Sequence, residues 1–468
     1  MFTEIINKKF PAKDIKAPES LIIKNIFIPG KTPNEDLAAD ILIEKGIIRS
    51  AEGIVDTCGI EFDYPLYPGI NSEKKHVLGI SSNGKAAILN AGGLTCSASF
   101  TDMHVHLREP GDEEEECINS GINAALKGGI TAMCCMPNTK PVIDNDCLVS
   151  FIKMKAAKSD FNIYPAAAIT KGLNGLEITD FGVLKNAGAA AFSDDGKCVQ
   201  DSKLMYEIMR YAKYHEALLI LHEEDYSFSA EGAMHEGYYS TKLGIGGISP
   251  LSEEIIIARD IMLAEKTGAK VHITHISSKK SVEMIKSARE AGINITCDVT
   301  PHHIFFNDSA LKNYNTNLKV NPPVRGPEDQ EALIAGLKSG VIDAIASDHA
   351  PHLDSEKNTT FIKAANGSTG LETLFKASYT KLCIEENLNF LHFLKLISTN
   401  PSRIIGHKAG QISSGSNADI AILDTKKQEI FDVRNTYSKS SNSAFDGIKL
   451  YGKIICTIKN GKIVFLDF

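Results

Sequence analysis

Five short apolar runs of this sequence each end in side chains that commonly bind metal ions. These side chains are His104 and His106, the pair Asp194 and Asp195, then His222, His275 and Asp348. Imidazole nitrogens and carboxylate oxygens suit zinc, and a shared carboxylate could bridge two ions. One histidine taken alone is more often structural than a ligand, but chance rarely ends five runs in this way. The pattern therefore predicts a metal centre that holds one or two Zn²⁺ ions.

The spacing of His104 and His106 fits a strand that presents both rings to one side. Alternate residues of a strand face the same way, so both imidazoles would point toward the same interior. Other histidines do not share this placement, and we expect structural roles for them: His215, His235, His272, His302 and His303.

Strands and helices that alternate from about residue 98 to residue 350 must position these ligands. Short apolar runs and amphipathic stretches follow each other in turn, which is typical of β/α units. The expected strands are Ala98–His106, Thr131–Met136, Asn162–Ile169, Ala189–Asp194, Ala217–His222, Lys270–Ile276, Asn294–Thr300 and Asp343–Asp348. The expected helices include Glu116–Lys127, Lys203–Tyr214, Glu253–Thr267, Ser281–Ala291 and Asp329–Lys338, and the third connection is weaker. Eight units predict an α/β fold, a closed (β/α)₈ TIM-like barrel with its active site at the carboxyl ends of the strands.

Both flanks of the barrel look different, with short strands joined by Gly- and Asn-containing turns. The expected strands are Ser20–Pro29, Asp40–Ala51 and Lys85–Leu94 before the barrel, then Ala418–Asp424 and Tyr451–Phe468 after it. We expect them to form one small β-sandwich domain built from both chain ends. The domain limits would be 1–97 and 407–468 for this domain and 98–406 for the barrel, with residues 55–84 as loop.

Composition narrows the class of protein. The chain has 468 residues, 43% of them hydrophobic, which is ample for a large core. A net charge of −8 gives no basic surface for nucleic acid. The start lacks the apolar core of a signal peptide, and no apolar run approaches the roughly 20 residues that span a bilayer. We therefore expect a cytoplasmic protein that acts on small molecules.

A series of motifs runs in order from about residue 98 toward the end of the chain. The motifs are Asp102–Gly111, Met136–Thr139, Phe192–Gly196, Thr274–Ser277, Thr300–His303, Asn321–Arg325, Ser347–His352 and Gly447–Gly452. Together they resemble the motifs of dihydroorotases, a branch of the amidohydrolase superfamily. Such a set is far more specific than any one motif.

The resemblance implies two groups of zinc ligands: His104, His106 and Asp348 for the first ion, and His222 and His275 for the second. Many members of the superfamily bridge the ions with a carboxylated lysine on the fourth strand. Here that strand ends in Phe192-Ser193-Asp194-Asp195 without a lysine, which is similar to the branch that bridges with aspartate. We assign the bridge to Asp195, with Asp194 as the alternative.

Asp348 is the predicted catalytic residue. A bound metal would lower the pKa of a coordinated water to about 7, so that it could attack a ring amide carbonyl. Asp348 would take the proton and then deliver it to the leaving ring nitrogen, as general base and then general acid. The alternative is that Asp348 is only a passive ligand.

Arg108 is the predicted anchor for a substrate carboxylate. It lies two residues beyond His106 on the same strand parity, and its guanidinium can form paired hydrogen bonds to a carboxylate. A structural ion pair is the alternative. The acidic run Asp112–Glu116 lies where we expect the first barrel helix to begin, a place that favours carboxylates. The resemblance also implies substrate contacts from Asn138 and His352 at the carboxylate and from Asn321 at the ring amide. His106, a predicted metal ligand, would contact the substrate as well.

The long polar stretch Leu353–Thr369 follows the eighth strand and is a candidate active-site lid. Relatives commonly carry a Pro-Phe-Gly-like turn here that contacts substrate, whereas this chain has Ala365-Asn366-Gly367. The departure affects the backbone contacts of the loop, for which Asn366 and Gly367 are the predicted residues.

The leading hypothesis is a zinc-dependent dihydroorotase, which hydrolyses (S)-dihydroorotate reversibly to N-carbamoyl-L-aspartate in de novo pyrimidine (UMP) biosynthesis. One alternative is a cyclic amidase of the hydantoinase or allantoinase kind, and these resemble bridging-lysine proteins. Another is a catalytically silent homologue that acts as a scaffold or as a partner of a transcarbamoylase. A homodimer is the default expectation for a protein of this class.

Overall fold

Eight parallel strands form the barrel in this computed structural model, which describes residues 19–29, 39–51, 62–63, 76–81, 86–408 and 411–467. In sheet order they are β8 (Phe100–Val105), β9 (Ile130–Cys135), β10 (Asn162–Ala168), β11 (Ala191–Ser193), β12 (Leu218–Leu221), β15 (Lys270–Ile273), β16 (Ile295–Val299) and β17 (Ala344–Ile345). Val105 at the end of β8 pairs in parallel with His349, and the His106 N–H donates to the His349 carbonyl at 2.8 Å. These contacts bring the two edges of the sheet together, so the predicted barrel is confirmed.

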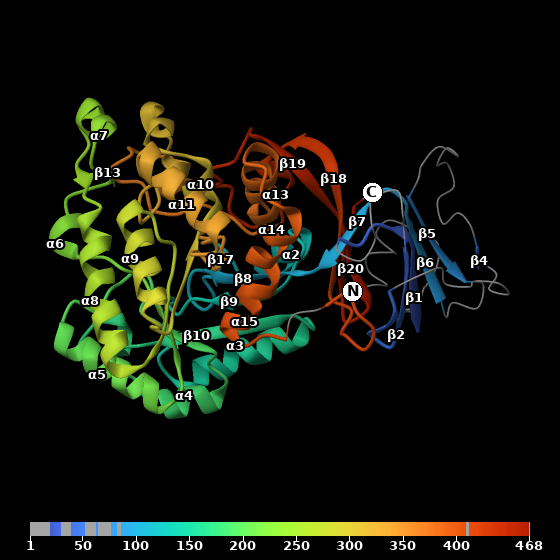
Figure 1. Ribbon diagram of the computed structural model, residues 1–468, viewed down its shortest axis with the longest axis horizontal. Helices are drawn as coiled ribbons and strands as arrows, with labels where there is room; N and C mark the ends of the chain where they lie inside the picture. Colours follow the sequence, from blue (N-terminus) through green and yellow to red (C-terminus); the bar gives the residue numbers. More distant parts are fainter. Residues whose placement is uncertain are drawn as a thin grey trace.

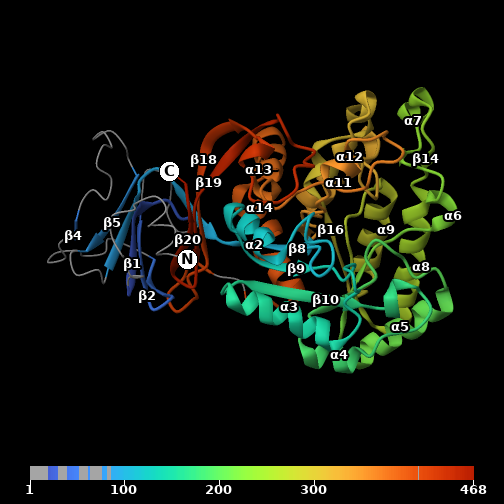
Figure 2. The same ribbon diagram turned by 180° about the vertical axis from the view of Figure 1, so that it is seen from behind.

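Helices cover the outside of the barrel (Figures 1 and 2). The longer ones are α2 (Ile118–Lys127), α3 (Asp146–Lys158), α5 (Ser202–Tyr214), α8 (Leu251–Thr267), α9 (Lys279–Glu290) and α11 (Pro327–Ser339). The shorter ones are α4 (Phe181–Ala187), α6 (Tyr226–Ser229), α7 (Tyr238–Leu243), α10 (Pro301–Phe305), α12 (Asp354–Lys357), α13 (Leu374–Tyr379), α14 (Phe390–Leu394) and α15 (Asn400–Ile405). The weak third connection corresponds to α4, which has only 7 residues.

The sequence of α5 shows how such a helix forms and packs. The Asp201 carboxylate accepts a hydrogen bond from the Leu204 N–H and so caps the first turn. Met205, Ile208, Met209 and Ala212 recur at helical spacing and are all buried. The apolar stripe fixes the face that α5 turns toward the barrel.

The first barrel helix begins later than expected. Helix α2 starts at Ile118 after the N-cap Cys117 and has no acidic residue in its first turn. The interpretation of the acidic run Asp112–Glu116 as a helix start is therefore wrong. These carboxylates belong to the turn before α2, where Glu115 and Glu116 contact residues near the active site.

The small β-domain lies at one end of the barrel, where strands from early and late in the sequence lie side by side (Figures 1 and 2). One sheet has the order β3 (Ile47–Ser50), β2 (Ala39–Glu44), β1 (Ser20–Ile26), β6 (Ala86–Ala91), β5 (His76–Ser81) and β4 (Phe62–Asp63). The other has the order β20 (Lys462–Leu466), β19 (Lys449–Lys459), β18 (Ile420–Ile430) and β7 (Thr95–Ala98). Ile23, Ile41 and Leu89 of the first sheet share a core with Ile420 and Ile458 of the second. The predicted β-domain from both chain ends is confirmed.

The prediction of loop for residues 55–84 is wrong in part. Within this range β4 pairs with β5, and β5 pairs with β6 from His76↔Ala91 to Ile80↔Ala87. The short segment His76–Ser81 contains a glycine and lacks strict alternation of apolar and polar residues, so its own pattern is weak. Pairing with its neighbour β6 makes it a strand.

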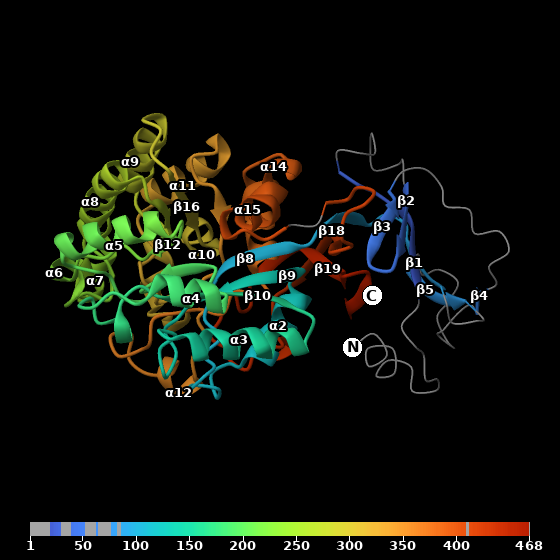
Figure 3. The ribbon, with the colours of Figure 1, turned by 90° about the horizontal axis from the view of Figure 1, so that it is seen from below.

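The small domain leads directly into the barrel. Strand β7 ends at Ala98 and β8 begins at Phe100, so only Ser99 separates the two strands, which are both labelled in Figure 1. Figure 3 shows β8 from below, where it extends from the side of the small domain into the barrel. The expected first strand Ala98–His106 thus spans the end of one strand and the whole of another. The domain limits drawn from the sequence stay predictions.

Small apolar residues lie beneath the carboxyl ends of the strands. Ala191, Ile220 and Ala344 belong to one buried cluster and precede Asp195, His222 and Asp348 by an even number of residues. Alternation along β12 places Ile220 and His222 on the same side, and Ala191 and Ala344 lie in the strands that lead to Asp195 and Asp348. The barrel therefore supports its polar site on an apolar floor.

None of the helices in the described ranges is long and apolar enough to cross a membrane.

Phe375 of α13 offers a test of the packing outside the barrel. Its ring is 1% exposed and stacks on Phe100 and Tyr379, with ring centroids 5.2 Å and 5.3 Å apart. We expect Phe375→Ala to lower the free energy of unfolding by about 3–5 kcal/mol, because the cavity cannot refill. Urea denaturation followed by circular dichroism measures it. Leu176→Ala, at a side chain that is 81% exposed, should change stability by less than about 0.5 kcal/mol. Equal effects of the two substitutions would contradict this account.

Candidate metal centre

Each predicted metal ligand lies at or just beyond the carboxyl end of a barrel strand. His104 is in β8 and His106 follows it, Asp195 follows β11, His222 follows β12, His275 follows β15, and Asp348 follows β17. All six side chains are buried. The closed barrel thus brings together, at one site, residues that are spread over about half of the sequence.

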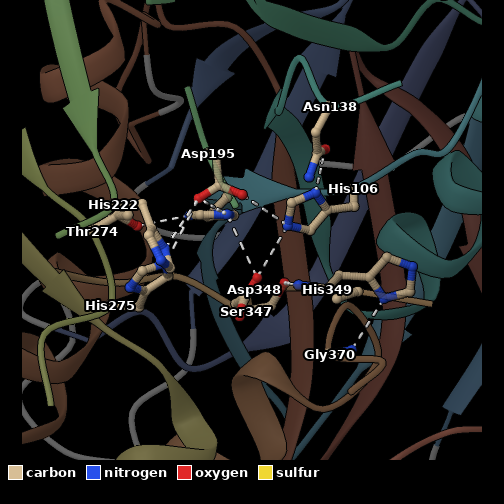
Figure 4. A network of polar contacts seen from close by, with 12 residues as sticks. His106, Asn138, Asp195, His222, Thr274, His275, Ser347, Asp348, His349 and Gly370 are labelled. Carbon is tan, nitrogen blue, oxygen red and sulfur yellow. Dashed lines mark hydrogen bonds and ion pairs between the residues drawn. The ribbon is translucent and has the colours of Figure 1, made fainter. Parts of the chain in front are cut away.

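Asp195 lies at the centre of this group (Figure 4). Its Oδ1 is 3.3 Å from His104 Nε2, 3.7 Å from His275 Nε2 and 3.9 Å from His222 Nδ1. Its Oδ2 is 3.4 Å from His106 Nε2. One carboxylate therefore faces four imidazoles, which is the arrangement that a bridge between two metal ions requires.

Asp348 closes one side of the group. Its Oδ1 is 3.5 Å from His104 Nε2 and 3.3 Å from His106 Nε2. Ligand atoms of these three residues lie within 4.8 Å of one another, and the same holds for His104, Asp195 and His275. The two groups share His104, so together they form one continuous cluster of possible metal ligands.

Asp194 has other partners. Its carboxylate accepts hydrogen bonds from the Ile169 N–H at 2.8 Å, the Thr170 N–H at 2.9 Å and the Thr170 hydroxyl. These bonds tie β11 to the segment after β10. Asp194 therefore stabilises the fold locally, and the geometry favours Asp195 over Asp194 as the bridge.

A hydrogen bond to the far nitrogen orients three of the four imidazoles. His106 Nδ1 is 2.8 Å from Asn138 Oδ1, and His222 Nε2 is 3.0 Å from a Glu224 carboxylate oxygen. Both partners accept, so each of these ring nitrogens carries the proton. His106 Nε2 then keeps its lone pair and faces Asp195, as metal ligands do. His222 Nδ1 lies 3.1 Å from His275 Nε2 and 3.9 Å from Asp195 Oδ1.

Beneath His104, a network that ends on Asp298 fixes the third ring. The Thr274 hydroxyl donates to Asp298, so it accepts from His104 Nδ1–H at 2.7 Å. Asp298 also accepts from the His275 N–H at 2.7 Å and contacts His272 Nε2 at 2.8 Å. Asp298 of β16 therefore positions two predicted ligands without facing the site itself.

The donor set fits a metal cation. His104 Nε2 and Asp195 Oδ1 are buried atoms without a hydrogen-bond partner among the described residues. His104 Nδ1 carries a proton toward Thr274, so a neutral ring would turn a lone pair toward two carboxylates. That arrangement is stable only with a positive charge between them. Nitrogen and oxygen donors of this kind suit zinc.

Electrostatics point the same way. Burial disfavours a charged His104, but the carboxylates of Asp195 and Asp348 outweigh burial and raise its pKa to about 10. Burial also opposes ionisation of Asp195, yet His104 and His275 hold the pKa of Asp195 well below its ordinary value. The site therefore holds ionised carboxylates and attracts a cation, and a metal ion would displace the His104 proton.

The backbone is strained at three site residues. His275, Asp348 and Arg108 have φ angles of 38°, 46° and 59°, in the left-handed region that side chains with a Cβ seldom adopt. Each such conformation costs on the order of 1–3 kcal/mol. The surrounding barrel holds these residues in the conformations that aim them at the site.

A cavity of about 220 Å³ opens over the ligands. Pockets that bind drug-sized ligands measure roughly 300–1,000 Å³, so this smaller cavity suits a ligand with one small ring. Its lining contains the predicted residues His106, Arg108, Asn138, Asp195, His222, His275, Asn321, Asp348, His352, Asn366 and Gly367, together with Gly196 and Ala350. Of the predicted site residues, only His104 does not line it. His104 lies beneath, 1% exposed.

Arg108 both lines the cavity and forms an ion pair. Its Nε is 2.8 Å from Glu115 Oε2 and donates to the Pro351 carbonyl at 3.1 Å. One Nη lies 3.3 Å from His352 Nε2, so the two predicted carboxylate contacts are neighbours. Glu115 thus anchors one edge of the guanidinium and leaves the rest for a ligand.

Several of these partners could not be assigned from apolar runs alone. Glu224 lies two residues beyond His222 and accepts hydrogen bonds from both His222 and Asn321, whose Nδ2 is 3.1 Å away. Spacing by two was a usable signal for Glu224, as was a lone carboxylate within a buried run for Asp298. Nothing in the local sequence linked Glu115 to Arg108.

The histidines expected to be structural lie outside the ligand group. His272 contacts Thr296 and Asp298, and His303 Nε2 lies 2.9 Å from the Pro322 carbonyl. His302 Nε2 is buried without a hydrogen-bond partner among the described residues, and burial holds its pKa well below the ordinary value. Burial also lowers the pKa of His303, to about 4, so His302 and His303 pack as neutral side chains around the site.

Two family models match the chain. One described as "Dihydro-orotase-like" covers residues 96–281, and one described as "Amidohydrolase family" covers residues 268–465. A protein of Caldicellulosiruptor saccharolyticus named dihydroorotase is 45% identical over 384 residues, which are 82% of this chain and 89% of that protein. Another so named, from Acetivibrio thermocellus, is 44% identical over 445 residues, 95% of this chain and 98% of that protein.

Solved structures with the same fold come from related enzymes. An L-hydantoinase (dihydropyrimidinase) of Arthrobacter aurescens matches with a TM-score of 0.78 and 22% identity over 96% of both chains. A dihydropyrimidinase of Brevibacillus agri matches with a TM-score of 0.75 and 20% identity, over 96% of this chain and 95% of that one. At these identities the likeness concerns the fold alone.

The two adjacent aspartates provide a matched pair for a test of the metal centre. Asp195→Ala should lower the metal content by at least one ion for each chain and remove most activity, because the shared ligand is lost. Asp194→Ala should mainly lower the melting temperature, because it breaks the bonds to Ile169 and Thr170. Elemental analysis and thermal denaturation of both variants check this. Normal metal content in Asp195→Ala with a loss in Asp194→Ala would reverse the assignment.

Proposed function

Since the chain belongs to the dihydroorotase family of amidohydrolases, we propose that it is a zinc-dependent dihydroorotase. It is a cyclic amide hydrolase that interconverts (S)-dihydroorotate and N-carbamoyl-L-aspartate, a step of de novo pyrimidine biosynthesis. One observation carries most weight: the cavity that joins a metal-ligand group to Arg108, Asn138 and Asn321. A cytoplasmic location, a homodimer and a transcarbamoylase partner stay predictions.

The metal ligands are proposed as His104, His106, Asp195, His222, His275 and Asp348. When bound, the metal supplies a nucleophilic water at neutral pH and polarises the ring carbonyl. These residues would hold one or two ions, and Asp195 would be the ligand common to both positions. Carbon dioxide should not be needed for activity, because no lysine lines the cavity in the described part of the chain.

Substrate orientation is proposed to follow from charge and hydrogen bonding. The guanidinium of Arg108 binds the ring carboxylate, and His352 lies beside it. The Asn138 oxygen is used by His106, so its amide Nδ2 remains to donate to substrate. Asn321 donates to Glu224, which leaves its Oδ1 to accept from a ring N–H. These contacts hold the scissile amide over Asp348.

Asp348 is proposed to move the proton. Although burial opposes ionisation, the His106 and His104 rings hold the pKa of Asp348 below its ordinary value, so the carboxylate is ionised and carries no proton of its own. It takes the proton from the attacking water as the new C–O bond forms. It then returns that proton to the ring nitrogen as the C–N bond breaks, so the charges balance.

A substrate comparison tests the proposed activity. Metal-replete protein should convert dihydroorotate and N-carbamoyl-aspartate in both directions, with no comparable turnover of hydantoin or allantoin. Chromatography of the reaction mixtures measures each product. Turnover of hydantoin or allantoin without dihydroorotate would select the alternative cyclic amidase. A folded protein that binds no metal and remains inactive with added zinc would select the scaffold.

Two aspartates of the same barrel segment separate catalysis from stability. Asp348→Asn should lower kcat by about 10²–10⁴-fold, because an amide cannot accept and return the proton. Asp343→Asn, at the amino end of β17, should lose its 3.2 Å contact with Arg289 and some stability but keep kcat within a few-fold. Steady-state kinetics with metal analysis checks both. Normal kcat in Asp348→Asn would leave it a passive ligand.

A further inference from the structure

Two lysines, Lys319 and Lys357, are buried beside the loop of residues 362–367. Lys319 is only 5% exposed, and Lys357 is only 4% exposed. A buried ammonium group normally requires a charged partner. In the described ranges of the chain, neither lysine forms an ion pair with a carboxylate, and burial lowers the pKa of both. Some other interaction must keep them in place.

Carbonyl groups of the loop are the partners of both lysines. Lys319 Nζ donates to the carbonyls of Ile362 and Ala364, each at 2.7 Å. Lys357 Nζ donates to the carbonyls of Ala365 at 2.7 Å and Gly367 at 2.8 Å. Four carbonyls within six consecutive residues are thus bound by two ammonium groups.

Further contacts fix the same loop against the cavity wall. The Gly367 N–H donates to the Lys319 carbonyl at 2.8 Å, and Asn442 Nδ2 donates to the Gly367 carbonyl at 3.1 Å. Gly367 has φ 142°, and a Cβ there would lie 2.7 Å from the Ala350 Cβ. The loop therefore rests on Ala350 with no room for displacement toward it.

The loop also presents substrate-side groups. Asn366 and Gly367 line the cavity, and the Asn366 carbonyl accepts from His352 Nε2 at 2.8 Å. After burial itself, the charges of Arg108 and Lys357 are among the causes that lower the pKa of His352 to about 4. The positive charge of Lys357 thus acts on His352, the predicted contact for the substrate carboxylate.

We propose that Lys319 and Lys357 are positioning residues, which hold residues 362–367 in their substrate-binding shape before substrate arrives. The loop is then a preformed wall of the cavity and does not close over substrate as a lid. This inference rests on the proposed function only for the identity of the substrate.

Kinetics of lysine variants test the proposal against a matched control. Lys319→Met and Lys357→Met remove the ammonium group. The first leaves the carbonyls of Ile362 and Ala364 unpaired, and the second leaves that of Ala365 unpaired, while the Gly367 carbonyl keeps its bond from Asn442. We expect the KM for dihydroorotate to rise at least about tenfold, with metal content unchanged and kcat altered much less, because pre-organisation of the site is lost. A rise in KM below about twofold in both variants would overturn the proposal.

Lys459→Met is the control. Lys459 is also 4% exposed, but it pairs with Asp419 in the small β-domain, away from the cavity. Its substitution should lower the melting temperature without changing KM. If Lys459→Met raises KM as much as the other two do, a general loss of stability explains the effect and the positioning role is refuted.

Hydrogen exchange of the wild-type holoenzyme keeps the proposal testable even if the methionine variants do not fold. The N–H groups of Lys363, Ala364, Ala365 and Gly367 all donate to backbone carbonyls. A preformed loop predicts equal protection of these amides with and without N-carbamoyl-aspartate. Fast exchange in the free protein, with protection only in the product complex, would show a closing lid. Absence of dihydroorotate turnover would defeat the proposed function but not this result.

Discussion

The contact between the Asp195 carboxylate and four imidazoles is the constraint on which the rest of the site depends. A buried carboxylate needs a positive charge beside it, which either a protonated ring such as His104 or a bound metal ion supplies. Strands β8, β11, β12 and β15 bring these groups together, and only a closed sheet can aim all of them inward. Asn138, Thr274 and Glu224 then hold the far ring nitrogens, which leaves the near nitrogens free for the metal.

Sequence patterns predicted the parts of this arrangement that repeat. Each predicted metal ligand ends an apolar run, and the alternation of these runs with helices predicts the barrel. The position of a residue at the end of its strand was therefore enough to predict that His104 through Asp348 lie at one site. Contacts set by tertiary distance were not predictable in the same way. Arg108 meets Glu115 because the turn before α2 is longer than expected, and β5 is a strand only because β6 lies beside it. The two buried lysines gave no local signal, since their partners are backbone carbonyls 8 to 45 residues away.

The comparisons separate fold from chemistry. The hydantoinase and dihydropyrimidinase structures share the architecture at 20–22% sequence identity. The proteins named dihydroorotase are 44–45% identical to this chain. A barrel of this kind carries many reactions, because its loops and strand ends change while its core persists. We propose that the distinction lies in a few positions: Asp195, two residues beyond β11, and Arg108, beyond β8.

The shared core of the small β-domain has a consequence for biosynthesis. Strands β1 to β7 leave the ribosome before the barrel, but β18 to β20, which cover part of their apolar surface, leave it after the barrel. The early sheet must therefore wait with the apolar residues that later pack against β18 to β20 uncovered while the barrel is translated. Domains that emerge first usually fold first, and here that order is reversed for one domain. A nascent chain of this protein would be most prone to aggregation, and most in need of a chaperone, just before its final strands appear.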